Sequence, residues 1–192
     1  MAASKGKKLV YISENLIDKA SRVSRDEGVS LSKLVETALT EAIKVNELGY
    51  TSKQMAQFFN VLQTNRVLGG LFVPSGVLDY MIELCGKGDV QKLQVLWYES
   101  GKWNGKYLKE TFADPVEAFK HFLELSRWDL NEVDIKANEG SRSVKVRCVS
   151  TVMSVEGTQL LSKYIEGVLS GLGYKTLHLD FLKGMIIIES EK

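Results

Sequence analysis

The sequence predicts an α+β protein made of two parts: a dimeric strand-helix-helix unit, and a C-terminal α+β domain with an antiparallel sheet (helices, then β-β-α-β-β). Three observations support this prediction. Apolar residues recur at helical spacing up to Trp128. After Trp128 they alternate along short segments on either side of one further helical stretch. The chain of 192 residues is 44% hydrophobic and 26% charged, which is an ordinary globular composition.

The first predicted element is a short strand at residues 7–13, with the sequence KKLVYIS. Successive side chains of a strand point to opposite faces. Val10 and Ile12 are therefore expected on the inward face. The outward face is expected to carry Lys7, Leu9 and Tyr11.

Two helices complete the first unit, which we place at residues 1–48. Ser13 and Ser30 are good N-cap residues, and Gly28 and Gly49 supply the stops. A unit of this size cannot bury the apolar stripe of its second helix, and its strand has no partner within the unit. Two copies that pair their strands and interlock their helices remove both deficits, so the pattern predicts a homodimer. The stripe consists of Leu31, Leu34, Val35, Ala38, Leu39, Ala42 and Ile43.

The stretch KKLVYISENLIDKASRVSRDEGVSLSKLVETALTEAI resembles the ribbon-helix-helix family of DNA-binding regulators. The matching features are the strand with its basic start, the S-E-N-L entry to the first helix, the G-V-S-L-S-K turn and the long aliphatic second helix. The resemblance implies double-stranded DNA as the partner. A two-stranded antiparallel ribbon fits the major groove, and its outward side chains read base edges.

The resemblance also implies which residues contact DNA. Lys7, Leu9 and Tyr11 lie on the ribbon, and Ser32 and Lys33 lie where free backbone N–H groups at the start of the second helix would bind a phosphate. Leu9 is apolar where the family usually has a polar residue, so packing of Leu9 and Tyr11 elsewhere in the protein is the alternative. Residues 1–25 carry six basic and two acidic side chains. Charge alone favours a solvated surface over a local contact with an anion.

Residues 49–65 are predicted to form a connecting helix, and residues 66–192 the second domain. The segment RVLGGLFV fits either a strand or a loop. Helices are predicted for VLDYMIEL after Pro74, for residues 89–112, and for the segment that opens with the capping-box-like pattern DPVE.

Four strands and one helix are predicted after Trp128. The first two strands are indicated by LNEVDI and by the alternation in SVKVRC, with a turn at Glu139 and Gly140 between them. A helix follows at 154–172. The chain ends in a hairpin of residues 174–181 and 185–189, with its turn at Lys183 and Gly184.

Two pairs of glycines lie within predicted helices of this domain. Gly101 and Gly105 are four residues apart, as are Gly167 and Gly171, so each pair occupies one helix face. Glycine inside a helix costs about 1 kcal/mol relative to alanine. The pattern therefore indicates a close approach to the backbone, either by another helix or by a ligand.

The segments YESGKWNGKYLKE, LNEVDI, SVKVRCVS and LLSKYIEGVLSGLGY resemble the 4-vinyl reductase domain, a relative of the Bet-three transport-particle fold. This resemblance covers residues 66–190 and implies a sensory module that binds a small apolar or aromatic molecule. Aromatic residues are frequent in this half and could line an apolar cavity, for which Tyr98, Trp103 and Phe122 are the candidates. Many relatives hold zinc with cysteines of the closing hairpin, but HLDFLKGMIIIE contains none.

Other classes of function lack support in the sequence. No phosphate-binding glycine loop, zinc-protease motif or nucleophile elbow is present, so we predict no enzyme, no cofactor and no metal. A site made of Cys148, His178 and Asp180 is a weak alternative. The longest apolar runs are far shorter than the roughly 20 residues that span a bilayer, and no signal peptide is recognisable. Two cysteines do not make a disulfide framework, so a cytoplasmic location is expected.

Together these features predict a cytoplasmic transcriptional regulator, in which the N-terminal dimer binds DNA and the C-terminal domain senses a small molecule. The alternative is a DNA-associated interaction adaptor or chromosome-binding protein without a small-molecule ligand. The two differ inside the second domain, because an adaptor predicts full packing and a sensor predicts a cavity of roughly 300 Å³ or more.

Overall fold

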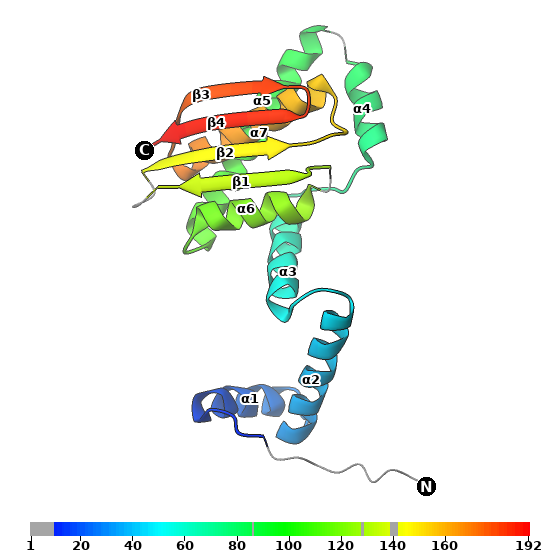
Figure 1. Ribbon diagram of the computed structural model, residues 1–192, viewed down its shortest axis with the longest axis vertical. Helices are drawn as coiled ribbons and strands as arrows, with labels where there is room; N and C mark the ends of the chain where they lie inside the picture. Colours follow the sequence, from blue (N-terminus) through cyan, green and yellow to red (C-terminus); the bar gives the residue numbers. More distant parts are fainter. Residues whose placement is uncertain (1–9, 86, 128, 139–141) are drawn as a thin grey trace. The chain divides into compact units, whose positions relative to one another are not determined.

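Figure 1 shows the computed structural model of the chain, which describes residues 10–85, 87–127, 129–138 and 142–192. The chain divides into two compact units, Met1–Ala56 and Gln57–Lys192, which are described separately below. Along the described residues, six helices precede two strands, a seventh helix and two more strands. The predicted α+β class and the β-β-α-β-β order are therefore confirmed. No helix in this described part is both long enough and apolar enough to cross a bilayer.

The first unit contains the helices α1 (Glu14–Asp26) and α2 (Leu31–Glu47), which pack against each other. The turn between them closes at Gly28, whose φ of 66° lies in the left-handed region that favours glycine. There the N–H of Val29 donates to the Ser24 carbonyl oxygen at 2.9 Å, as in a Schellman cap. The predicted stop at Gly28 is thus confirmed.

The described residues contain no N-terminal ribbon. Lys7 and Leu9 lie outside the described residues, and residues 10–13 form no strand. A ribbon consists of two paired strands, and a chain with one such segment cannot satisfy that strand's hydrogen bonds alone. Pairing through a second copy therefore stays a prediction.

The first unit has almost no core of its own. Among its described residues, 10–56, only Ser24 is buried. Helix α2 buries none of its residues, and the second half of its apolar stripe faces solvent. Exposed large apolar side chains of this unit include Val10, Tyr11, Ile12, Leu16, Val23, Leu39, Ile43, Leu48 and Tyr50.

Four helices lead toward the sheet: α3 (Ser52–Val67), α4 (Ser75–Glu83), α5 (Lys87–Thr111) and α6 (Pro115–Ser126). The division between the units falls within α3 and within the segment 49–65 predicted to connect them. RVLGGLFV contributes the end of α3 and then a loop, not a strand. The side chain of Asp114 accepts a hydrogen bond from the Glu117 N–H at 3.0 Å, so the predicted cap of α6 is confirmed.

The remaining elements are β1 (Glu132–Ala137), β2 (Ser143–Val149), α7 (Val155–Leu172), β3 (Lys175–Leu182) and β4 (Met185–Glu191). The predicted turn at Glu139 and Gly140 lies outside the described residues. The sheet has the order β1-β2-β4-β3, and every neighbouring pair is antiparallel. The register aligns Ile135, Val146 and Ile188 in one buried row across three strands.

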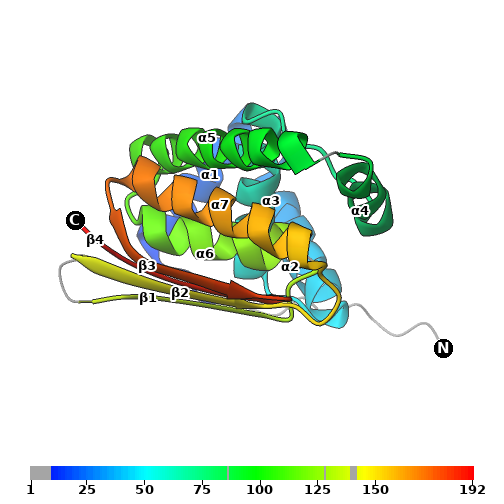
Figure 2. The same cartoon turned by 90° about the horizontal axis from the view of Figure 1, so that it is seen from above.

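The second unit is built in layers, which Figure 2 shows edge-on to the sheet. Helices α6 and α7 cover one face of the sheet, and α5 packs on α7 from the side away from the strands. Helix α7 is therefore buried on two sides and supplies much of the core through Leu161, Ile165, Val168 and Leu169. The opposite face of the sheet carries surface ion pairs such as Lys145–Glu189 at 2.7 Å.

The four helical glycines bring α5 and α7 into backbone contact. A Cβ atom on Gly101 would overlap the carbonyl oxygen of Tyr164, and one on Gly105 would overlap that of Val168. Reciprocally, a Cβ atom on Gly167 or Gly171 would overlap a carbonyl oxygen of α5. The sequence indicated a close approach either by another helix or by a ligand. At these four positions it is made by another helix.

We expect Gly105→Ala to destabilise the protein by about 3 kcal/mol or more, because the added methyl group meets backbone atoms that cannot move aside. Helix propensity alone predicts the opposite sign, a gain of about 1 kcal/mol. Gly76→Ala in α4 is the matched control, since no atom lies within 4 Å of its added Cβ. Urea unfolding followed by tryptophan fluorescence measures both variants. Equal stability of the two would contradict the backbone contact.

Candidate functional site

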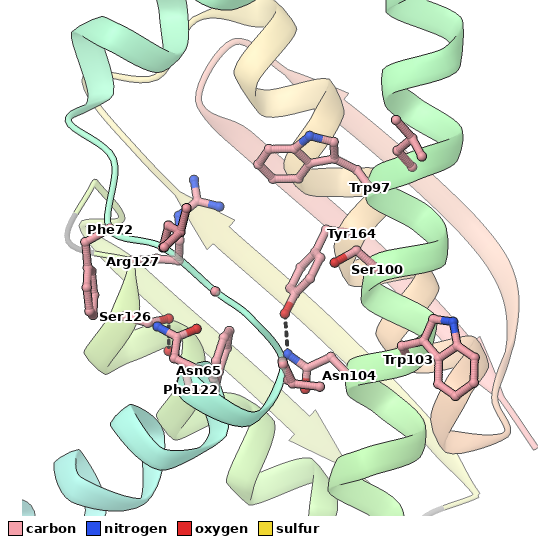
Figure 3. A pocket seen from close by; sticks show the side chains of 14 residues that line it. Asn65, Phe72, Trp97, Ser100, Trp103, Asn104, Phe122, Ser126, Arg127 and Tyr164 are labelled. Carbon is pink, nitrogen blue, oxygen red and sulfur yellow. Dashed lines mark hydrogen bonds between the residues drawn. The ribbon is translucent and has the colours of Figure 1, made fainter.

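The second unit contains a cavity of about 610 Å³ between α5, α6, α7 and the loop after α3. We call it the aromatic cavity, and Figure 3 shows it from close by. Helix α5 contributes Trp97, Ser100, Trp103 and Asn104 to its lining, because residues three or four apart share one helix face. The loop supplies the opposite wall, which includes Phe72. The lining from α6, the residue after it and α7 consists of Phe122, Ser126, Arg127 and Tyr164.

Tyr164 lies at the centre of the aromatic side chains in this cavity. The Trp97 ring meets it edge-on, with ring centroids 6.3 Å apart and an interplanar angle of 81°. The Phe122 ring stacks beside it at 6.5 Å and 29°. Offset stacked and edge-on arrangements are the favourable ones for aromatic pairs, so these three rings form a well-packed apolar wall.

Two of the three residues predicted for the cavity line it, and one does not. Trp103 and Phe122 are part of the lining. Tyr98 is not, because the rotation of about 100° per residue places it on the side of α5 opposite the arc that carries Leu96, Trp97, Ser100, Trp103 and Asn104. The carbonyl of Tyr98 instead faces Gly167 in the crossing of α5 and α7.

The sequence reading did not single out Asn104 or Arg127. Trp97, Ser100 and Asn104 recur at helical spacing on one face of α5, and this was the signal available for Asn104. Arg127 comes at the end of α6, where no periodicity marks it.

The polar centre of the cavity is a pair formed by Asn104 and Tyr164. The amide nitrogen Nδ2 of Asn104 donates a hydrogen bond to the phenol oxygen of Tyr164, drawn as a dashed line in Figure 3. Asn104 is only 2% exposed, yet its Oδ1 atom has no partner among the described residues. Burial raises the pKa of Tyr164 well above its usual range, against smaller opposing effects of Asn104 and Arg127. The phenol therefore stays protonated at neutral pH.

Among the described residues that line the aromatic cavity, the one charged side chain is already paired. Arg127 donates from Nε to Oδ1 of Asp129 at 2.8 Å, and from a terminal nitrogen to Oδ2 at 2.6 Å. Burial of Asp129 opposes ionisation, but the hydrogen bonds and positive charge of Arg127 outweigh it and hold the pKa of that carboxyl below its usual value. The forked pair neutralises the guanidinium, which leaves the cavity wall without net charge.

A second, smaller cavity of about 190 Å³ lies on the other side of Phe122. Its polar group is His121, whose Nε2 atom lies 3.1 Å from the Gln57 amide nitrogen and 3.3 Å from a Glu117 carboxylate oxygen. The volume is below that of usual ligand sites, so we regard the aromatic cavity as the candidate site.

The described residues contain no group of three or more histidine, cysteine or acidic side chains that could hold a metal ion. Cys148 faces the core from β2, and burial raises the pKa of its thiol to about 12. His178 is exposed on β3, and β4 separates that strand from β2. The alternative site of Cys148, His178 and Asp180 is therefore not formed.

The predicted DNA-contacting residues that the structure describes are exposed in the first unit. Tyr11 is 91% exposed, and Ser32 and Lys33 lie in the first turn of α2. One detail of the prediction is wrong, because the backbone N–H of Lys33 is not free. It donates to the side chain of Ser30 at 3.2 Å, which caps the helix. Lys7 and Leu9 lie outside the described residues.

We expect Asp129→Asn to destabilise the protein at neutral pH by about 1.5–3 kcal/mol, because it removes the ionic partner of a partly buried guanidinium. A carboxyl whose pKa is lowered by folding stabilises the protein above its unfolded pKa, and this contribution is lost as the pH falls through the folded value. The difference between the wild type and the variant should therefore be largest near pH 7 and shrink below the usual carboxyl pKa of 3.8.

Urea unfolding at a series of pH values measures that difference. Asp134→Asn is the matched control, since its surface ion pair with the exposed Lys136 is expected to add little stability. A difference between wild type and Asp129→Asn that does not change down to pH 3 would contradict the assigned ion pair.

Comparison with known proteins adds no assignment. No family model, curated protein or solved structure matches this chain.

Proposed function

We propose that this protein is a homodimeric DNA-binding transcriptional regulator whose second unit senses a small apolar or aromatic molecule. The observation that carries the proposal is the lack of a core in the first unit, which buries only Ser24 among its described residues. The second unit buries an extensive core by comparison. The first unit is thus the part that requires another molecule for its stability.

A second copy of the chain is the partner that fits this requirement. Leu39 and Ile43 are each more than half exposed on α2, and Leu16 is similarly exposed on α1. Burying one such side chain contributes about 1.5–3 kcal/mol, so several of them supply a stable interface. A symmetric pair also brings two N-terminal segments together, which the predicted ribbon requires.

Several exposed groups of the first unit suit a contact with DNA. Tyr11 is free of packing within its own unit, and the start of α2 presents backbone N–H groups beside the side chain of Lys33. Helix α1 adds the exposed basic residues Lys19, Arg22 and Arg25. These features, together with the resemblance to ribbon-helix-helix regulators, favour a β-ribbon in the major groove over an uncharged protein interface.

The aromatic cavity supports the sensory half of the proposal. Its volume of about 610 Å³ exceeds the roughly 300 Å³ at the lower end of the range for small-molecule sites. An interaction adaptor without a ligand instead predicts a fully packed second unit. The cavity therefore favours a sensor over the adaptor alternative.

We expect the full-length protein to bind the DNA upstream of its own gene more tightly than an unrelated fragment. The double variant Lys7→Ala/Tyr11→Ala should lose about 10- to 100-fold in affinity for the upstream fragment, as expected for one or two lost base or phosphate contacts. A fluorescence anisotropy titration over a range of salt measures this. The logarithm of the affinity should fall linearly with the logarithm of the salt concentration.

The matched control is Tyr80→Ala/Lys92→Ala, which removes an exposed tyrosine and an exposed lysine of the second unit and should leave DNA binding unchanged. Equal affinity for both fragments would instead favour a chromosome-binding protein. No binding at low salt would refute the DNA-binding role.

A further inference from the structure

We propose that the aromatic cavity binds a neutral, multi-ring apolar ligand through one hydroxyl group, which Asn104 and Tyr164 recognise together. This inference rests on the proposed sensory role of the cavity and specifies the chemistry of its ligand. Three features of the cavity carry it: the buried oxygen of the Asn104 amide, which has no described partner, the pairing of Arg127 with Asp129, and a large volume lined by aromatic rings.

The hydrogen-bonding capacity of Asn104 and Tyr164 matches a hydroxyl group. The bond from the Asn104 amide nitrogen to the phenol oxygen leaves Oδ1 of Asn104 as a buried acceptor with no described partner. It also leaves the phenol hydrogen of Tyr164 outside that bond. A ligand hydroxyl would donate to Oδ1 of Asn104 and accept from the phenol hydroxyl of Tyr164. The same hydroxyl serves the reversed amide orientation, in which the free groups are the amide N–H and the phenol oxygen.

The charges around the cavity favour a neutral ligand. Both carboxylate oxygens of Asp129 accept hydrogen bonds from Arg127. An anionic ligand would therefore have to compete with a forked ion pair already in place. The remaining polar side chains of the lining, Asn65, Ser100 and Ser126, carry no charge. A charged group of a ligand placed against this wall would lose its hydration and would find no unpaired side chain of opposite charge among the described lining residues.

The shape of the cavity favours a ligand with more than one ring. Its volume of about 610 Å³ lies in the middle of the range that holds drug-sized molecules, so a single six-membered ring would fill only a minor part. Trp97, Phe122 and Tyr164 offer aromatic surface on the inner side. Trp103 is 64% exposed, so it forms part of the solvent-facing edge of the cavity.

The test uses three fluorescent probes that share one four-ring body: 1-hydroxypyrene, pyrene and pyrene-1-carboxylate. The full-length protein is titrated with each at neutral pH, and probe fluorescence reports binding. We expect 1-hydroxypyrene to bind about tenfold more tightly than pyrene, which is the gain typical of one well-made hydrogen bond. Pyrene-1-carboxylate should bind most weakly.

Two variants assign the preference to the named residues. Asn104→Leu keeps a similar side-chain volume without polar atoms, and Tyr164→Phe keeps the ring without its hydroxyl. Each should lose most of the roughly tenfold preference for 1-hydroxypyrene over pyrene, whatever its affinity for pyrene itself. Far-UV circular dichroism tests that both variants fold. Asn60→Leu, in the lining of the smaller cavity, is the matched control and should keep the preference.

Each other outcome overturns a defined part of the account. Binding of pyrene and 1-hydroxypyrene with equal affinity would refute the hydroxyl site and leave the sensory role standing. Tightest binding of the carboxylate would refute the neutral class of ligand. A preference for 1-hydroxypyrene that survives in both variants would show that other residues recognise the hydroxyl. Failure of all three probes to bind would refute the inference and the sensory role together.

Discussion

The backbone contact between α5 and α7 is the constraint on which the rest of the second unit depends. Glycine pairs on both helices let each helix approach the carbonyl groups of the other so closely that an added Cβ atom would overlap them. The contact fixes α7 between α5 and the sheet, where its apolar residues complete the core. Tyr164, whose carbonyl meets Gly101, is thereby set beside Asn104 on the facing helix. The same crossing thus stabilises the domain and aligns the two polar groups of the cavity.

The two units solve the problem of burial in different ways. The second unit places α7 between α5 and one face of the sheet and so buries its core within a single chain. The first unit leaves residues such as Leu39 and Ile43 in contact with water, and the proposed dimer would supply the burial that this unit lacks. In the regulator proposed above, the second unit would bind the ligand and the first unit would bind DNA only as a pair. Ligand binding to the second unit would then alter how the pair meets DNA.

Local patterns predicted most elements of the fold, because caps and periodicities are set by neighbouring residues. Ser30 and Asp114 cap the helices they were expected to cap, and Val144, Val146 and Cys148 alternate into the core as their spacing indicated. The cavity was less predictable. Periodicity places residues on a face but does not say which face meets a neighbouring helix, which is why Tyr98 was chosen in place of its neighbour Trp97. The role of Asn104 could not be predicted from its neighbours, because its partner Tyr164 lies 60 residues away in the sequence.

Sedimentation equilibrium of the full-length protein tests the central claim most directly, because reading DNA with a ribbon and completing the first unit both require two chains. We expect a mass twice that of the 21.5 kDa chain at micromolar concentration. Replacing the exposed stripe residues in Leu39→Glu/Ile43→Glu should convert this dimer to monomer, because two charges would enter the apolar interface. A wild-type protein that sediments as a monomer with its first unit fully helical would contradict the account.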